Sequence, residues 1–425
     1  MSAVTGSDVG TGERSLDLLV VTQYFWPENF QINLIVRELV ARGHRVTVLT
    51  GKPNYPAGKF YEGYSFFGQA EEQWEGARVL RLPLIPRGNN RRLGLLLNYL
   101  SFSAIAWLLG PRRLRDARFD AIFVYAPSPL FVGLPALRLQ RLWGVPMLYW
   151  LQDLWPESVA LAGGIQSNLV LNAIAKVVAH IYHGSARVVI QSRAFQADVE
   201  AAGIPPERIV YFPQTTTAHF RPLPRSEAVE EDKLLPKGFR VMFAGNIGSA
   251  QDFGTLLAAA ERLRDHAEIQ WIIVGDGRRR PWVAAEVRRR GLEHCVHLPG
   301  RFPEEAMPRF FAQADALLVT LERKRIYSLT IPTKVQAYLA SGKPIIAGLD
   351  GEGARVIEEA GAGLTAPASD PAALAARVLE MSRLSEAERA EMGRRARAYA
   401  EREFDKDRLI DGLVATIRQT IAETR

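Results

Sequence analysis

The sequence predicts an α/β protein built from two domains, and three observations support this. The chain has 425 residues, whereas single hydrophobic cores stop growing at about 250 to 300 residues. Residues 16–25, LDLLVVTQYF, form the near-continuous apolar run of a parallel strand buried on both faces. A helical pattern over 31–43 and a second strand over 44–50 follow, which completes a βαβ unit. A new α/β pattern begins at FRVMFAGNIG, residues 239–248.

Further apolar strands follow in both halves, and each ends in a polar, glycine-containing or proline-containing loop. In open parallel sheets, ligands bind at these carboxyl ends. Residues 215–236 are polar and charged without an apolar period, so they are predicted to link the domains. We therefore expect a disordered tail over 1–14, Rossmann-like domains over 15–214 and 237–400, and a helix over 401–425 that packs back on the first domain.

Composition limits the cellular setting. The opening residues, MSAVTGSDVGTG, lack the basic start, apolar run and cleavage site of a secretory signal, which predicts a cytoplasmic protein. The single cysteine, Cys295, has no partner for an internal disulfide or a metal site and is expected to be a buried apolar residue. The formal charge of +7 is expected to reflect a membrane surface, with no nucleic-acid partner.

A basic apolar segment lies in the first half. Leu84–Phe119 contains seven arginines and one aspartate, and these flank Leu93–Gly110, which is apolar except for Asn98, Ser101 and Ser103. Three interpretations stay open: a buried helix of an α/β layer, an amphipathic helix lying on an anionic membrane, and a transmembrane span, for which the segment is slightly short.

Three features of the second half could bind an anion. Residues 243–254, FAGNIGSAQDFG, join a strand to a helix whose free N–H groups would favour a phosphate. Gly275, Gly277 and Gly300 follow strands and would let a ligand approach the backbone. Lys334 lies at the start of a helix, where a point charge and the helix dipole could act on the same anion.

In order and spacing, these motifs resemble the second domain of the GT-B glycosyltransferases, in particular the retaining family 4. The matching segments are Gly245–Gly248, VGDG at 274–277, Gly300-Arg301, Pro332–Lys334, SGKPII at 341–346, Gly351–Gly353 and Gly361–Leu364. In the first half, RELVARGHRVTVLTGKPNYPAG and DLWPES also match. The resemblance covers Leu16 to about Arg408 and is closest to bacterial enzymes of O-antigen and capsule synthesis, including N-acetyl-fucosamine transferases.

The resemblance implies two facing Rossmann-like domains with a cleft between them, a first domain for the acceptor and a second for the nucleotide sugar. It implies a UDP-linked donor, no cofactor and no bound metal; the sequence also lacks an Asp-x-Asp pair in a strand-end loop that could hold one. The residues expected to bind the donor are Asn246, Gly248, Gln251, Gly275, Asp276, Gly277, Gly300, Arg301, Thr333, Lys334, Gly351, Glu352 and Gly353.

The chain departs from the family pattern at two places. Leu329 and Ala337 stand where many members carry two glutamates, and Asn246 and Gln251 stand in a loop where many place an arginine and a lysine on the diphosphate. Some other cation must replace these charge-assisted hydrogen bonds. Lys334 is the expected replacement.

Catalytic roles are expected for Asp153, Lys334 and Glu352. Glu352 lies in DGEGAR, interpreted as a flexible loop, and could contact sugar or ribose hydroxyls in place of the missing glutamates. Asp153 could orient hydroxyl groups, or it could be a helix N-cap, which favours Asp for structural reasons. Four residues are expected in loops that face the acceptor or the diphosphate: Glu28, Asn29, Asn54 and Tyr55.

The predicted function is transfer of a sugar, such as an N-acetylated deoxyhexosamine, to a lipid-linked or oligosaccharide acceptor with retention of anomeric configuration. The basic apolar segment fits an acceptor carried on a polyprenyl diphosphate and a peripheral location on the inner face of the plasma membrane. Two alternatives stay open: a nucleotide-sugar epimerase of GT-B fold, and a non-catalytic, membrane-bound partner of other transferases.

Overall fold

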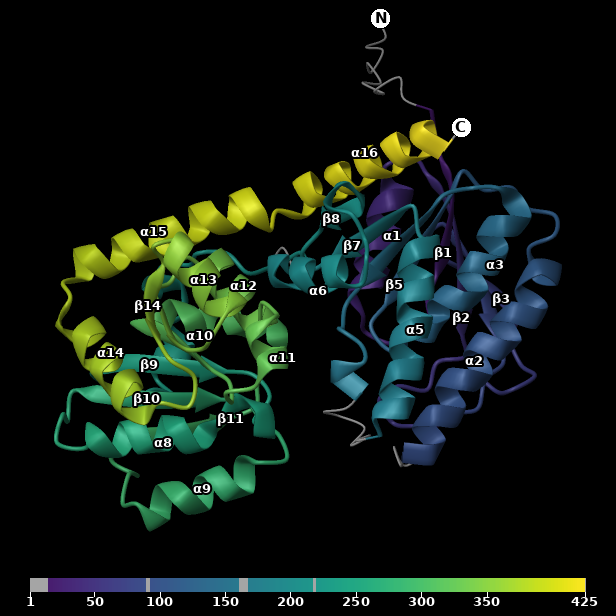
Figure 1. Ribbon diagram of the computed structural model, residues 1–425. Helices are drawn as coiled ribbons and strands as arrows, with labels where there is room; N and C mark the ends of the chain where they lie inside the picture. The colour runs from purple at the N-terminus through teal and green to yellow at the C-terminus, as the bar shows by residue number, and fades with distance from the viewer. Residues whose placement is uncertain (1–13, 89–91, 160–166, 217–218, 425) are drawn as a thin grey trace, which may run out of the picture. The chain divides into compact units, whose positions relative to one another are not determined.

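The structure is a computed structural model that describes residues 14–88, 92–159, 167–216 and 219–424. It comprises two compact units, the first formed by the chain up to Val189 together with Val414–Arg425, and the second by Ile190–Leu413. Each unit has its own predominantly parallel sheet (Figure 1). Residues 1–13 of the predicted tail lie outside the described residues.

The first sheet has the strand order β3-β4-β2-β1-β5-β6-β7-β8. Its strands are β1 (Asp17–Val21), β2 (Arg45–Gly51), β3 (Glu71–Trp74), β4 (Ala77–Leu82), β5 (Ala121–Ala126), β6 (Met147–Leu151), β7 (Arg187–Ile190) and β8 (Ile209–Tyr211). The sequence interpretation missed β3 and β4, because β3, EEQW, is a charged strand at the sheet edge that pairs antiparallel with β4.

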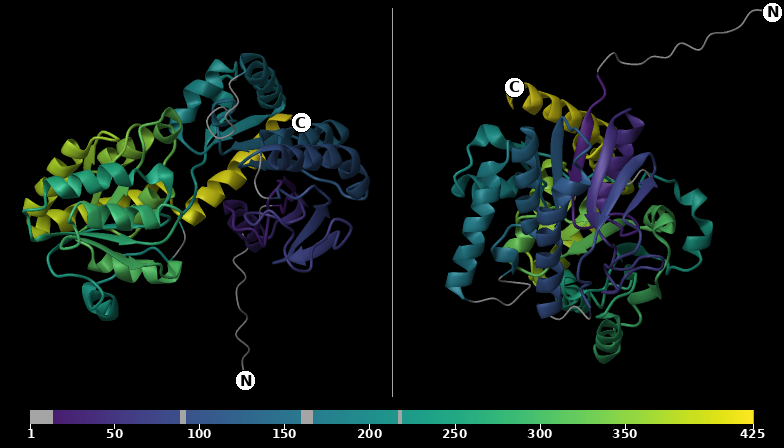
Figure 2. Two further views of the ribbon diagram at one scale, coloured as in Figure 1. Left: turned by 90° about the horizontal axis from the view of Figure 1, so that it is seen from below. Right: turned by 90° about the vertical axis from the view of Figure 1, so that its right-hand side faces the viewer.

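Helices cover both faces of this sheet. They are α1 (Gln31–Ala41), α2 (Arg92–Arg113), α3 (Gly133–Trp143) and α5 (Asn168–Gly184), whereas α6 (Gln196–Ala201) falls in the second unit. Helix α1 lies on one face, whereas α2, α3 and α5 lie side by side on the other (Figures 1 and 2). The strand order runs in opposite directions on the two sides of the β1–β5 pair. Because the crossover connections are right-handed, the helices change from one face of the sheet to the other there. This is the switch point at which such sheets bind ligands.

The buried face of helix α2 carries Asn98 and Ser103 beside Phe102 and Ala106, and its exposed face is apolar. Asn98 is fully buried; its amide donates to Ile85 O at 2.6 Å and accepts from Gln23 at 2.7 Å. Ser101 accepts from Ile85 N at 3.0 Å. The opposite stripe carries the exposed side chains of Leu93, Leu96, Leu97, Leu100, Trp107 and Leu108. Hydrogen bonds from these polar residues thus hold α2 against its own unit. The leucines, which a helix buried in an α/β layer would cover, are exposed.

The second sheet is parallel throughout, in the order β11-β10-β9-β12-β13-β14. Its strands are β9 (Phe239–Ala244), β10 (Ile269–Val274), β11 (Val296–Gly300), β12 (Ala316–Thr320), β13 (Ile345–Gly348) and β14 (Gly363–Ala366). Cys295, directly before β11, is buried as predicted. The switch point of this sheet lies between β9 and β12.

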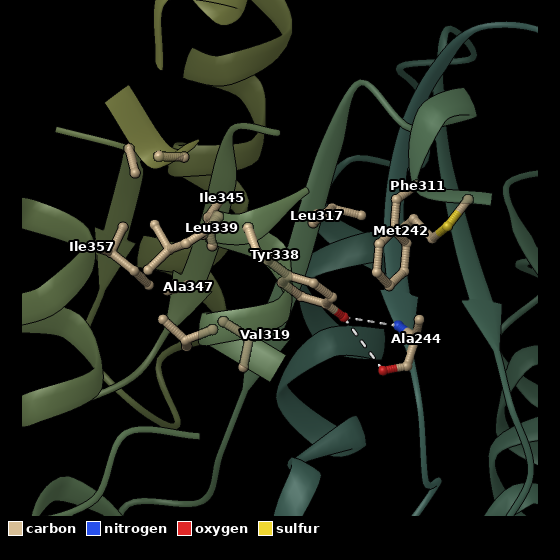
Figure 3. Packing of buried hydrophobic residues seen from close by; sticks show 14 of the residues in the cluster. Met242, Ala244, Phe311, Leu317, Val319, Tyr338, Leu339, Ile345, Ala347 and Ile357 are labelled. Carbon is tan, nitrogen blue, oxygen red and sulfur yellow. Dashed lines mark hydrogen bonds between the residues drawn. The ribbon is translucent and has the colours of Figure 1, made fainter. Parts of the chain in front are cut away.

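Two buried clusters, one on each face, hold this unit together. One packs the sheet against α8 (Phe253–Arg262), α9 (Arg280–Arg289) and α14 (Pro371–Arg383). The other packs it against α10 (Met307–Gln313), α12 (Thr333–Ala340), α13 (Glu352–Glu359) and α15 (Glu386–Glu403), and Figure 3 shows part of it. Short helices α7 (Val229–Asp232) and α11 (Arg325–Ser328) complete the unit.

The predicted linker and terminal helix take more structured forms. Residues 215–236 include α7, and Gln313 of α10 donates to the carbonyls of Arg225 and Ala228 at 2.9 and 3.0 Å, so this segment is fixed within the second unit. The charged C-terminal pattern forms two helices, α15 and α16 (Lys406–Thr424), separated at Phe404, which is buried. From Val414 onward the chain belongs to the first unit.

Candidate functional site

Tyr338 forms hydrogen bonds to the backbone at the switch point of the second sheet. Strands β9 and β12 pair only at Val241 and Met242, so the backbone of Ala244 beyond them has no partner strand on that side. The hydroxyl of Tyr338 on α12 accepts from Ala244 N at 3.1 Å and donates to Ala244 O at 3.4 Å (Figure 3). These bonds satisfy a buried peptide unit and hold α12 against the end of β9.

Lys334 lies one turn before Tyr338, so both side chains point toward the same strand end. Its ammonium donates to Gln251 Oε1 at 2.7 Å and lies 4.7 Å from the centre of the Phe243 ring. Burial lowers its pKa from 10.5 to about 8. Gly245 is required beside it, because a Cβ there would lie 2.8 Å from Lys334 Cε and φ is +131°. Lys334 is therefore a desolvated cation whose hydrogen-bond partner is a neutral amide.

The N-terminus of α12 adds backbone donors to this lysine. No side chain caps the helix at Pro332, and its first turn has no acidic residue, so the N–H groups from Thr333 onward have no capping carboxylate. The N-terminus of α8 differs, because Asp252 accepts from Thr255 N at 3.3 Å and from Ser369 at 2.7 Å. The prediction of free N–H groups at α8 is therefore wrong at Thr255, and α12 is the better anion site.

The first sheet presents an isolated carboxylate at its carboxyl edge. Asp153 follows β6, and burial raises its pKa from 3.8 to about 6. Within the part of the chain that the structure describes, its carboxylate has no hydrogen-bond or ion-pair partner, which favours a free acid over the N-cap alternative. The Tyr125 ring of β5 is close enough for the charge of Asp153 to contribute to raising the pKa of that phenol.

Comparisons with known proteins agree with this architecture. A glycosyl transferase 4-like domain matches residues 29–215, and a glycosyl transferases group 1 domain matches residues 238–383. The chain belongs to the family 4 glycosyltransferases of GT-B fold.

Its relatives are distant. "Probable glycosyltransferase WbjE" of Pseudomonas aeruginosa is 26% identical over 350 residues, which is 80% of this chain and 84% of WbjE. WcaI of Escherichia coli K12, whose name refers to colanic acid biosynthesis, is 26% identical over 318 residues, 72% of this chain and 76% of WcaI. HepE of Anabaena, solved with UDP, has 16% identity and a TM-score of 0.68, and the match covers 95% of this transferase and 100% of HepE.

Two of the glycines predicted to let the donor approach the backbone, Gly275 and Gly277, instead allow the loops after β9 and β10 to pack against each other. A Cβ on Gly275 would lie 1.9 Å from Gly245 O, and one on Gly277 would lie 2.5 Å from Ile247 O. Asp276 O accepts from Ile247 N at 2.8 Å, so the loops after β9 and β10 form one structure. Gly300 has open space beside it, and Arg301 is exposed.

Glu352 is placed differently from the prediction. It begins α13 rather than lying in a flexible loop, its side chain is 4% exposed, and it accepts from Arg355 at 2.8 and 2.9 Å. Gly351 and Gly353 beside it pack on Ser328 and Pro332. The carboxylate is therefore already neutralised, because a glutamate in the first turn of a helix reaches an arginine at i+3.

The basic run beside the site is also neutralised. Arg323 pairs with Asp350, Lys324 with Glu322, and Arg325 with Asp198. These three cations have carboxylate partners, whereas Lys334 has none among the described residues. Asn246 is exposed, and its side chain lies beside Gly248 and Gly277.

Two of the predicted acceptor-loop residues are buried inside their unit. Glu28 accepts from the backbone N–H groups of Phe25, Asn54 and Tyr55 at 3.2, 2.8 and 2.7 Å, and burial raises its pKa to about 7. Asn54 is fully buried and accepts from Asn98 at 3.3 Å. They join the loops after β1 and β2, while Asn29 and Tyr55 stay exposed.

Sequence reasoning placed Tyr55 in an acceptor loop but missed the aromatic group that it joins at this edge. The rings of Tyr24, Phe30 and Tyr55 lie 5.0 to 5.8 Å apart by their centres, and Phe30 reaches Tyr125 at 6.5 Å. Of these rings that of Tyr55 is exposed, whereas that of Tyr24 is buried. The signal was the aromatic content of TQYFWPENF directly after a buried strand.

Proposed function

We propose that this transferase moves a sugar from a UDP-linked donor to a lipid-diphosphate-linked acceptor in surface polysaccharide synthesis, with retention of anomeric configuration. One observation carries the proposal: a half-buried lysine, paired among the described residues only with an amide, lies beside a helix N-terminus without a side-chain cap at the switch point of the second sheet. HepE, of the same fold, was solved with UDP and with UDP-glucose, which supports a UDP-linked donor.

The chemistry follows from where negative charge develops. As the bond between the anomeric carbon and the diphosphate breaks, charge builds on the leaving diphosphate, and Lys334 with the N–H groups at Thr333 and beyond would stabilise it. A diphosphate oxygen takes the proton of the attacking hydroxyl, and the oxygen of that hydroxyl bonds to the anomeric carbon on the face from which the diphosphate leaves. Asp153 would orient hydroxyl groups of the sugars through its unpaired oxygens.

We further propose that the reaction needs no divalent metal, since Lys334 and the α12 N-terminus supply positive potential. Among the described residues no group of three or more His, Cys, Asp or Glu side chains could hold a metal ion. Turnover is expected to persist unchanged in EDTA. Loss of activity that Mg²⁺ or Mn²⁺ restores would refute this part.

The test is a donor screen followed by an acceptor assay. Nucleotide sugars, UDP-N-acetyl-deoxyhexosamines included, are scored by protection against thermal unfolding, and protecting donors are then incubated with a lipid-diphosphate sugar. Product with the donor's anomeric configuration supports the proposal, and product of inverted configuration refutes retention. Epimerised donor without acceptor favours the epimerase alternative, and donor binding without turnover favours the non-catalytic one.

We also propose that the exposed stripe of α2 binds an anionic membrane from the cytoplasmic side. By length and composition α2 could cross a membrane, since Leu93–Arg113 has a mean hydropathy of 1.6, but 28% of it is buried and its polar residues bind its own unit. An exposed row of leucines followed by the exposed Arg112 and Arg113 fits an interface of acyl chains and lipid phosphates.

Vesicle flotation tests the membrane contact. Leu96→Ser with Leu100→Ser should weaken binding to phosphatidylglycerol vesicles, and Arg112→Glu with Arg113→Glu should do the same. Leu234→Ser, at an exposed leucine of the second unit, is the matched control. Vesicle binding by all variants at the wild-type level would refute the proposal.

A further inference from the structure

Arg87, in the segment between β4 and α2, is a half-buried cation without a counterion. Its guanidinium carbon lies 4.9 Å from the ring centre of Tyr55 and 5.9 Å from that of Tyr24. Its Nε is buried without a hydrogen-bond partner, and among the described residues no carboxylate forms an ion pair with it. Arg81, on β4, by contrast, pairs with Glu72 and donates to the carbonyls of Gly51 and Trp26.

An unpaired, partly desolvated guanidinium is costly, so its position calls for a reason. The backbone holds it there: Arg87 N donates to Asn54 Oδ1 at 3.1 Å, and Gly88 N donates to Gly58 O at 2.8 Å. Gly58 has no room for a side chain, since a Cβ would lie 1.7 Å from Gly88 O. The segment is fixed to the loop after β2, and Arg87 is not a loose surface arginine.

The surroundings of Arg87 select for an oxyanion. Two tyrosine faces support the guanidinium and leave its edge as the donor surface. Burial, together with the neighbouring Tyr99 and Glu28, holds the pKa of Tyr24 well above 10, so its hydroxyl remains a neutral donor. Glu28 is engaged by three backbone N–H groups rather than by Arg87. Neutral sugar hydroxyls need no cation here, whereas a phosphate matches a guanidinium edge.

The location specifies which phosphate. Ile85, on one side of Arg87 in the chain, is exposed, and its backbone is bonded to Ser101 and Asn98 of α2. Leu93, at the start of the exposed stripe, follows on the other side. Arg87 therefore lies where the apolar stripe of α2 meets the aromatic edge of the sheet. A ligand that is apolar at one end, a sugar at the other and anionic between them fits this order.

We propose that Arg87, with the Tyr24 hydroxyl and the Tyr55 ring, binds the diphosphate that joins lipid and sugar in the acceptor. The proposal rests on the proposed function and adds to it the residue that recognises the acceptor's anionic link. It predicts that Arg87 acts on acceptor binding and leaves donor binding unchanged.

The test compares two soluble acceptors that carry the same sugar, one on a short prenyl diphosphate and one on a neutral alkyl chain of equal length. Arg87→Gln should raise KM for the diphosphate acceptor by about 10- to 100-fold, the loss expected for one or two charge-assisted hydrogen bonds, with kcat and the KM of the neutral acceptor little changed. Arg87→Lys should recover part of the affinity. Arg118→Gln, at an exposed arginine of the same unit, is the matched control.

Calorimetric binding of the prenyl diphosphate alone separates the two proposals, because it needs no turnover. If the wild-type protein binds the prenyl diphosphate but transfers no sugar, and Arg87→Gln loses this binding, the proposed function is refuted and the proposed site is supported. If Arg87→Gln raises KM equally for both acceptors, or leaves KM for the diphosphate acceptor unchanged, the proposed site is overturned while the proposed transferase function is unaffected. Arg87→Gln weakening phosphatidylglycerol vesicle binding without affecting the soluble diphosphate acceptor also overturns it, because the ligand is then the bulk lipid.

Discussion

Replacing Lys334 by methionine should make the free protein more stable and the donor complex weaker. Burial lowers the lysine's pKa from 10.5 to about 8, and each pKa unit corresponds to ~1.36 kcal/mol, so keeping Lys334 charged costs the free protein about 3 kcal/mol at neutral pH. Loss of the hydrogen bond to Gln251 offsets about 1 kcal/mol. Lys334→Met should therefore gain about 2 kcal/mol, or about 4 to 8 °C in the Tm of the second unit.

The gain has a defined pH dependence. Below pH 8 both the folded and the unfolded lysine are charged, so the folded state carries the full cost. Between about 8 and 10.5 the folded protein releases the proton first, which raises wild-type stability with pH. The advantage of Lys334→Met should therefore shrink over this range, as thermal scans at pH 7, 8.5 and 9.5 would show.

Donor binding should show the opposite preference. A diphosphate supplies the missing counterion and raises the lysine's pKa again, so binding near pH 8 should take up a fraction of a proton, measurable by calorimetry in buffers of different ionisation enthalpy. Lys334→Met should weaken UDP binding by about 10- to 100-fold. A variant that is less stable without ligand and binds UDP like the wild type would refute the reasoning. Lys343→Met is the control for binding: burial lowers the pKa of this half-buried lysine to about 8 as well, but it donates to the carbonyls of Ala312 and Ala314, and its replacement should leave UDP binding unchanged.

Three further predictions test other parts of the protein. Tyr338→Phe leaves the buried N–H of Ala244 unpaired and should lower the free energy of unfolding by about 1 to 3 kcal/mol in denaturant titrations, with UDP binding weakened because α12 is less well held. Asp153→Asn should slow turnover and remove the fall in wild-type activity below about pH 6, while raising Tm at pH 7, since burial penalises the ionised carboxyl; an unchanged pH profile would contradict this. Asn98→Leu should destabilise by about 2 to 4 kcal/mol, whereas a helix that leaves its unit to span a bilayer would tolerate the leucine.

The fold was predictable because its strands are apolar runs and its loops fall at their carboxyl ends. Lys334 was predictable for a related reason, since a cation at a helix start without a neighbouring acid is electrostatically mismatched unless an anion binds. Glu352 was not, because only the folded helix brings Arg355 to its carboxylate. The glycines of VGDG were read as open to a ligand, but sequence does not reveal that the space beside Gly275 is filled by Gly245 of another loop.

Helix α2 shows why polar interruptions in an apolar segment need a structure to interpret. From the sequence alone, Asn98 and Ser101 count against a transmembrane span whether their side chains face the protein or the lipid. In the fold they lie on one face and bond to the segment that carries Arg87, while the opposite face exposes leucines. The same polar residues therefore fix the apolar stripe beside the proposed diphosphate site, so the proposed membrane contact and the proposed acceptor recognition should be lost together when Asn98 is replaced.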